Sequence, residues 1–199
     1  MADKDIFTTI HTSGLILMGL KHCGKSTLGS MLAETLALPF YDLDKLILKD
    51  ISAEGYSSVR GLYRTAGRSK FQEYELSAAK KLADIMDRGP VAAALGGGTV
   101  ENEEAMRLLS SRALLLYLRV DEEELFRRIT ASGLPPFLDG EKSPKELFTE
   151  LYARRRILYE KTADAVLYLP VQPIEKNFRR LYSFITGTPE ETDKIKEHG

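Results

Sequence analysis

Five short apolar runs recur along the chain, and longer segments that mix apolar and polar residues separate them. The runs cover residues 15–18, 40–41, 91–95, 113–118 and 165–169. Uniformly apolar runs of this length are typical of parallel strands that are buried on both faces. Their alternation with helical patterns predicts an α/β fold, a three-layer α/β/α domain with a five-stranded parallel sheet.

The segments between the runs carry helix signals, with Gly67 interrupting one of them and Pro144 opening another. We expect helices from the end of the first glycine-rich turn to about 38, and over 45–50, 59–66, 68–86, 102–111, 121–131, 144–161 and 174–185. Residues 132–140 are too rich in glycine and proline for regular structure, and we expect a mobile lid over about 132–144. We expect residues 1–13 to be flexible, 14–187 to form a single domain, and 188–199 to be a disordered tail.

The first apolar run leads into a glycine-rich segment that reads GLKHCGKST, residues 19–27. A strand, then G-x-x-x-x-G-K-[ST], then a helix is the pattern of the phosphate-binding P-loop. Backbone N–H groups and the helix N-terminus bind phosphate oxygens there, Lys25 reaches the β/γ-phosphates, and the Ser26 hydroxyl coordinates Mg²⁺. The alternative is a plain strand-to-helix turn. The residues that we expect to bind nucleotide here are Gly19, Lys21, Cys23, Gly24, Lys25, Ser26 and Thr27.

Two further groups of residues follow predicted strands. Asp42 and Asp44 come after the run at 40–41, and residues 96–98 are three glycines after the run at 91–95. Ligands of open α/β sheets bind at the carboxyl ends of strands, so both groups are candidates for the active crevice. The alternatives are that Asp44 caps the next helix and that the glycines form a flexible turn.

Composition narrows the class of protein. The chain has 199 residues, a net charge of −1 and one cysteine. No global field attracts nucleic acid or an anionic membrane, no disulfide can form within the chain, and no run is long enough to span a bilayer. The start of the chain does not read as a signal peptide. We therefore expect a cytoplasmic protein, and we also expect it to be a monomer.

Taken in order, these motifs resemble the shikimate kinase family of P-loop, nucleoside-monophosphate-kinase-like proteins. The resemblance extends from about residue 15 to 185. It implies transfer of the ATP γ-phosphate to the 3-hydroxyl of shikimate in chorismate and aromatic amino-acid biosynthesis, with ATP and Mg²⁺ required. It also implies a small-molecule substrate, a substrate-binding helical region over about 44–86 and a lid that closes.

The resemblance also implies roles for single residues. Lys25 and Asp44 are the implied catalytic residues, and Asp42 joins Ser26 at the metal. Substrate contacts fall on Asp44, Gln72, Glu75, Gly96, Gly97, Gly98 and Arg155, where an arginine four residues before a tyrosine pairs with the shikimate carboxylate. Arg128 and the segment that contains Gln172 flank the adenine, although Arg127 is an alternative to Arg128.

Two departures from the family pattern leave other functions open. Gln72 stands where the family has an arginine that binds the substrate carboxylate, and Pro135 stands where it has the lid arginine. Arg68, Lys70, Lys142 or Lys145 are candidates to compensate. The alternatives are a kinase of another small polyol or cyclitol, and a catalytically impaired nucleotide-binding regulatory protein.

Overall fold

The fold is taken from a computed structural model that describes residues 6–131 and 133–189. Five strands form one sheet in the order β2-β3-β1-β4-β5, and every neighbouring pair is parallel. In the register, Leu17 of β1 lies between Ala94 of β3 and Leu116 of β4. The predicted five-stranded parallel sheet is confirmed.

The helices and strands follow the predicted bounds closely. The strands are β1 (Leu15–Met18), β2 (Phe40–Asp42), β3 (Ala92–Ala94), β4 (Leu114–Arg119) and β5 (Ala165–Tyr168). The α-helices are α1 (Ile6–Ser13), α2 (Lys25–Thr35), α3 (Leu43–Ser52), α4 (Val59–Met86), α5 (Glu103–Ser110), α6 (Glu122–Ala131), α7 (Pro144–Thr162) and α8 (Ile174–Thr186). Two 3₁₀ turns, η1 (Thr99–Glu101) and η2 (Pro136–Leu138), complete the described elements.

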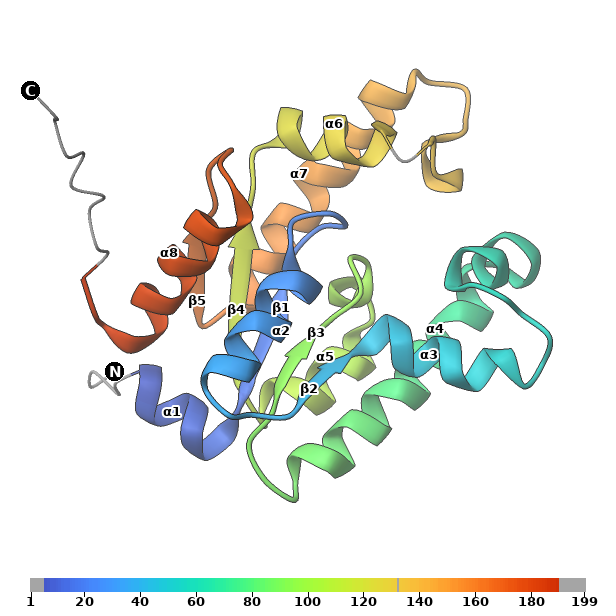
Figure 1. The fold of residues 1–199 in the computed structure, drawn as a ribbon. Coiled ribbons are helices and arrows are strands. Elements are labelled where there is room, and N and C mark those ends of the chain that lie inside the picture. Colours follow the sequence, from blue (N-terminus) through green and yellow to red (C-terminus); the bar gives the residue numbers. More distant parts are fainter. Residues whose placement is uncertain (1–5, 132, 190–199) are drawn as a thin grey trace, which may run out of the picture.

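Helices cover both faces of the sheet. In Figure 1, α2 and α8 contact each other in front of it, and α5 and α7 lie behind it. All four residues of β1 are buried, which is why that strand carries no polar side chain. The edge strand β5 is open on one side, with Val166 40% exposed. The central strand β1 therefore lies between two layers of helices, and the loop after it begins at the carboxyl edge of the sheet.

The expectation that residues 1–13 are flexible is wrong for residues 6–13, which form α1. This helix contacts β4 and α8, and the side chain of Ile10 is fully buried. An isolated helix of eight residues is unstable in water, so this tertiary contact is what holds it. Residues 1–5, and residues 190–199 of the predicted tail, lie outside the described residues.

The sequence predicts two irregular segments, a break at Gly67 and a segment without regular structure over 132–140. Gly67 interrupts α4 as expected, with φ 79° and ψ 179°. The expectation of no regular structure over 132–140 is wrong in one detail, because residues 136–138 form η2. The Leu138 side chain there is 1% exposed, and η2 contacts α7. Burial of this one apolar residue explains why the segment folds into a turn.

Among the described residues, none of the helices has both the length and the apolar character that crossing a membrane requires.

Candidate active site

The loop between β1 and α2 binds the side chain of Lys25, the first residue of α2. The Lys25 ammonium donates hydrogen bonds to the carbonyls of Gly19 (2.8 Å) and Leu20 (2.9 Å), and its side chain is only 7% exposed. Gly19 and Gly24 have φ of 146° and 102°, which L side chains rarely adopt. The predicted P-loop geometry is therefore present, with the charge of Lys25 held against the loop.

Asp42 at the end of β2 faces the first turn of α2. The Ser26 hydroxyl donates a 2.5 Å hydrogen bond to Asp42 Oδ2, and Oδ1 accepts from the Lys45 backbone N–H at 3.2 Å. Asp42 is therefore the N-cap of α3, and the alternative that Asp44 caps this helix is wrong. A hydroxyl and a carboxylate held this close offer the hard oxygen ligands that Mg²⁺ prefers.

Asp44 lies in the first turn of α3, next to these groups. Asp44 is exposed and lines a cavity, and the backbone of Gly96 packs close to its carboxylate. Desolvation raises the pKa of Asp44, the Asp42 carboxylate raises it further, and the ammonium groups of Lys25 and Lys21 oppose this shift. A carboxylate with a raised pKa binds a proton more readily than an ordinary aspartate, which suits a proton acceptor.

A cavity of about 280 Å³ brings most of the predicted nucleotide residues together, and we call it the P-loop cavity. Its lining includes Lys21, Lys25, Ser26, Thr27, Asp42 and Asp44, together with Gly24 and Gly97. Two of the predicted P-loop residues, Gly19 and Cys23, lie outside the lining. A Cβ at Gly19 would meet the Leu118 carbonyl at 2.7 Å, and Cys23 is 1% exposed.

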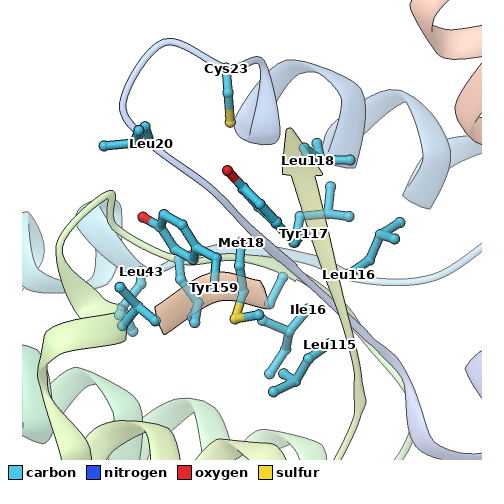
Figure 2. Packing of buried hydrophobic residues seen from close by; sticks show 14 of the residues in the cluster. Ile16, Met18, Leu20, Cys23, Leu43, Leu115, Leu116, Tyr117, Leu118 and Tyr159 are labelled. Atoms are coloured by element: carbon cyan, nitrogen blue, oxygen red, sulfur yellow. The ribbon is translucent and has the colours of Figure 1, made fainter. Parts of the chain in front are cut away.

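Cys23 is directed away from that cavity. Figure 2 shows its side chain pointing from the loop toward the buried cluster that contains Tyr117. Its backbone N–H donates to the Leu20 carbonyl at 3.3 Å, within the loop itself. The structure thus gives the Cys23 side chain a packing role.

The three glycines after β3 each approach a different functional group. A Cβ at Gly96 would lie 2.8 Å from Asp44 Oδ1, and one at Gly97 would lie 2.8 Å from the backbone nitrogen of Lys21. A Cβ at Gly98 would lie 3.1 Å from Arg155 Nη2. The absence of side chains therefore lets this turn touch the carboxylate, the P-loop and the arginine at once. The alternative of a merely flexible turn does not explain these contacts.

Tyr159 on α7 binds the backbone of this glycine turn. Its hydroxyl donates to the Gly97 carbonyl at 2.8 Å, and its ring stacks on Tyr117 at a centroid distance of 4.8 Å (Figure 2). Burial raises the pKa of Tyr159 well above its ordinary value, so the hydroxyl stays protonated and donates. The sequence alone predicts no role for Tyr159, which enters the pattern only as the tyrosine four residues after Arg155.

On the other side of the turn lies a second cavity, of about 200 Å³, which we call the arginine cavity. Its lining includes Gln72, Glu75, Gly98, Arg155, Arg68 and Glu101. Of the adjacent arginines on α7, Arg155 is the more enclosed, with its side chain 17% exposed against 57% for Arg154. Four of the predicted substrate residues, Gln72, Glu75, Gly98 and Arg155, thus meet in this cavity. Asp44 and Gly97 line the P-loop cavity instead, and Gly96 lines neither cavity.

Glu75 connects α4 to the segment after the glycine turn. Its carboxylate accepts hydrogen bonds from Thr99 Oγ1 (2.6 Å) and Asn102 Nδ2 (3.0 Å), and it is 1% exposed. Burial raises the pKa of Glu75, and the two hydrogen bonds oppose that shift. Asn102 also caps α5, which the sequence signals by an asparagine before an amphipathic helix. Glu75 therefore fixes the wall of the arginine cavity.

Arg128 and Gln172 lie outside the lining of both cavities. Arg128 Nη1 donates to the His22 carbonyl of the P-loop at 3.2 Å, and its Nε bonds Glu124 at 2.6 Å. Arg127 also pairs with Glu124, but its side chain is 68% exposed. Of the two arginines, Arg128 is the one that reaches the P-loop. Gln172 donates to Asn177 Oδ1 at 2.9 Å.

The four cations considered as replacements for the missing arginines occupy different places. The lysines pair with acidic residues: Lys70 with Glu73, Lys142 with Glu150, and Lys145 with Glu122 and Glu123. Arg68 lines the arginine cavity, with its Nη2 3.8 Å from Glu101. Position therefore favours Arg68. Glu101 itself had no sequence signal, because it belongs to no motif.

The described residues contain no cluster of three or more His, Cys, Asp or Glu side chains that could hold a metal by themselves.

Comparison with known proteins gives consistent matches. A family model described as SKI: Shikimate kinase matches residues 21–186. The shikimate kinase of Chlamydia pneumoniae is 34% identical over 161 residues, which cover 81% of this chain and 88% of that protein. That of Bordetella avium is 33% identical over 164 residues, which cover 82% of this chain and 75% of that protein.

Solved structures match over most of their length as well. Shikimate kinase from Acinetobacter baumannii in complex with shikimate has a TM-score of 0.77 at 21% identity, covering 92% of this chain and 97% of that chain. Shikimate kinase from Aquifex aeolicus has a TM-score of 0.67 at 27% identity, covering 87% and 96%. The first of these similarities concerns the fold alone.

Proposed function

The chain belongs to the shikimate kinase family, and on that premise we propose that it transfers the γ-phosphoryl group of ATP to the 3-hydroxyl of shikimate. One observation carries the proposal. The glycine turn at 96–98 lies close to Asp44, the P-loop and Arg155 at once. It therefore brings together a phosphate site at the P-loop, a proton acceptor at Asp44 and a carboxylate site at Arg155. A kinase for a small hydroxy acid needs these three parts side by side.

The chain's own residues account for the transfer step. The 3-hydroxyl oxygen bonds to the γ-phosphorus as the bond to the β-γ bridging oxygen breaks, and ADP leaves. Asp44 accepts the proton of the attacking hydroxyl, which its raised pKa favours. Lys25 turns from the carbonyls of Gly19 and Leu20 toward the phosphate oxygens, whose negative charge it offsets.

Ser26 and Asp42 are the residues that would hold Mg²⁺, since their oxygens already lie 2.5 Å apart at the edge of the P-loop cavity. The ion would supply charge neutralisation at the β- and γ-phosphates. The finer assignment of Mg²⁺ as the required metal is part of this proposal.

Arg155 and Arg68 bind the acceptor carboxylate in this scheme. Both line the arginine cavity, and Arg68 supplies the positive charge that Gln72 lacks. A planar guanidinium matches a carboxylate well, and two of them compensate for one neutral position. At the nucleotide end, Arg128 and the segment around Gln172 flank the adenine, which the contact of Arg128 with the His22 carbonyl supports.

The test is a coupled ADP-release assay with Mg-ATP, in the presence and absence of shikimate, with Asp44→Asn as the control. We expect turnover that depends on shikimate and is lost in the variant. ATP binding without turnover on shikimate would contradict the proposal and would favour another acceptor. ATP binding without turnover on any acceptor would instead support a regulatory nucleotide-binding protein.

A second candidate is a kinase of an uncharged small polyol or cyclitol. Gln72 in the arginine cavity favours it, because this position brings no charge for a carboxylate. Measuring kcat/KM for shikimate against a panel of uncharged polyols distinguishes the two candidates, and a preference for an uncharged acceptor would favour the second.

We further propose that the enzyme acts as a monomer in the cytoplasm. Its single cysteine fits a reducing compartment. Multi-angle light scattering of the purified protein and fractionation of the cells that make it check the two statements.

A further inference from the structure

Glu101 at the end of η1 is an internal carboxylate inside the cavity proposed for the acceptor's carboxylate. Its Oε2 accepts from Arg155 Nη2 at 2.9 Å, and its Oε1 accepts from Arg154 Nε at 2.9 Å. Arg68 Nη2 lies 3.8 Å from Oε2. The Glu101 side chain is 11% exposed, so three guanidinium groups surround a largely buried anion.

The Glu101 carboxylate is ionised at neutral pH. Burial acts to raise the pKa of Glu101, but the hydrogen bonds and charges of Arg155 and Arg154 lower it below the ordinary value of a glutamate. An acceptor that carries its own carboxylate therefore meets a full negative charge beside Arg155.

Glu101 satisfies only part of Arg155. The Nε of Arg155 is buried and has no hydrogen-bond partner, whereas Nη2 is bonded to Glu101. A buried donor without a partner costs about 1–3 kcal/mol. A carboxylate that binds the Nε–Nη2 edge with both oxygens satisfies the orphan donor, which the single bond from Glu101 leaves unpaired.

Arg154 gives Glu101 a second place to bind when Arg155 changes partner. The Arg154 side chain is 57% exposed and already bonds Oε1, so Glu101 keeps an ion pair after it releases Arg155. The exchange thus leaves no buried charge without a partner, which is the costly outcome for a displaced ion.

We propose that Glu101 is a specificity-determining residue. Its carboxylate binds the part of the Arg155 guanidinium that the acceptor's carboxylate also binds, so it must be displaced when the acceptor binds. This inference rests on the proposed function, because it assigns a competitor to the same substrate group. It predicts that Glu101 weakens the binding of carboxylate acceptors and has little effect on uncharged ones.

The test compares Glu101→Gln with the wild type on two acceptors, shikimate and its methyl ester, which has the same ring and hydroxyls without the charge. We expect the variant to lower the KM for shikimate about five-fold or more, and to leave kcat and the KM values for the ester and ATP within two-fold. Glu103→Gln is the matched control, since it removes the same charge two residues away, outside the arginine cavity. We expect it to change none of these values by more than two-fold.

A higher KM for shikimate in Glu101→Gln would overturn the inference, because Glu101 would then position Arg155 for the substrate. An equal fall in both variants would also overturn it, since a general field would explain the effect. If Glu101→Gln fails to fold, Glu101→Asp, whose shorter side chain withdraws from Arg155, replaces it with the same expected result.

The wild type in the same assay tests the proposed function separately. If it does not turn over shikimate, calorimetric titration of shikimate into both proteins decides the inference. Tighter binding to Glu101→Gln would support it, and equal or absent binding would overturn it.

Discussion

The hydroxyl of Tyr159 donates a 2.8 Å hydrogen bond to the backbone carbonyl of Gly97, and so connects α7 to the centre of the glycine turn. Tyr159→Phe leaves that carbonyl without its donor and lets the turn shift against Lys21 and Arg155. We expect a loss of roughly 1–3 kcal/mol in the free energy of unfolding and a several-fold rise in the KM for shikimate. Urea denaturation and steady-state kinetics measure the two effects.

Tyr152→Phe is the matched control for this prediction. Tyr152 lies on the same helix and donates to the Val120 carbonyl at 3.1 Å, away from the glycine turn. We expect a similar loss of stability with an unchanged KM. Equal effects of both variants on the KM would show that the hydrogen bond of Tyr159 acts only through general stability.

Gly96→Ala and Gly98→Ala should impair different kinetic steps. A Cβ at position 96 would lie 2.8 Å from Asp44 Oδ1, so we expect the displaced carboxylate to lower kcat about ten-fold or more. A Cβ at position 98 would lie 3.1 Å from Arg155 Nη2, a long side chain that can give way, so we expect mainly a higher KM for shikimate. Steady-state kinetics of the two variants give the comparison, and the same kinetic pattern in both would contradict it.

Asp44→Asn should lower kcat by about 10²-fold or more, because an amide accepts no proton from the hydroxyl. The wild type should lose kcat as the pH falls through the raised pKa of Asp44, above the range of an ordinary aspartate. The pH profile of kcat provides the measurement. A variant that keeps wild-type kcat would exclude Asp44 as the proton acceptor.

The same substitution should stabilise the protein at pH 7. The folded state raises the pKa of Asp44, so folding is penalised when the group is ionised, and the asparagine removes that penalty. Below the ordinary pKa of aspartate, both folded and unfolded chains carry the proton and the gain disappears. Thermal unfolding at pH 7 and at the lowest pH where the protein stays folded checks the sign. A gain that grows toward acid pH would contradict it.

Arg128→Ala and Arg127→Ala form a matched pair at the nucleotide end. Both arginines bond Glu124 and together lower the pKa of Glu124 to about 2, but only Arg128 bonds the His22 carbonyl of the P-loop. We expect Arg128→Ala to raise the KM for ATP several-fold and Arg127→Ala to leave it within two-fold. Initial rates at varied ATP concentration measure this, and the reverse order would assign the adenine contact to Arg127.

Asp42→Asn should raise the Mg²⁺ concentration required for half-maximal activity, since the amide is a weaker ligand than the carboxylate. Asparagine caps helices as well as aspartate does, so α3 keeps its N-cap and the thermal stability should change little. Activity against Mg²⁺ concentration, with a melting curve, separates the two effects. An unchanged Mg²⁺ requirement would exclude Asp42 as a metal residue.

Local patterns in the sequence determined the parts of this protein whose physics is local. Strand bounds came from short apolar runs, the P-loop from residues adjacent in the chain, and the break at Gly67 from the conformational freedom of glycine. The carboxyl-edge rule for parallel strands also placed Asp42, Asp44 and the glycine turn in one crevice.

Tertiary structure alone decided the contacts between distant segments. Helix α1 exists because Ile10 finds a buried site, which eight residues do not determine by themselves. Helical phase relative to the sheet makes Arg155 more enclosed than Arg154, and it brings Arg155 to Glu101, which lies 54 residues away in the chain. Such pairings depend on how helices pack, because a sequence pattern states which face of a helix is apolar but not which charged groups meet beside it.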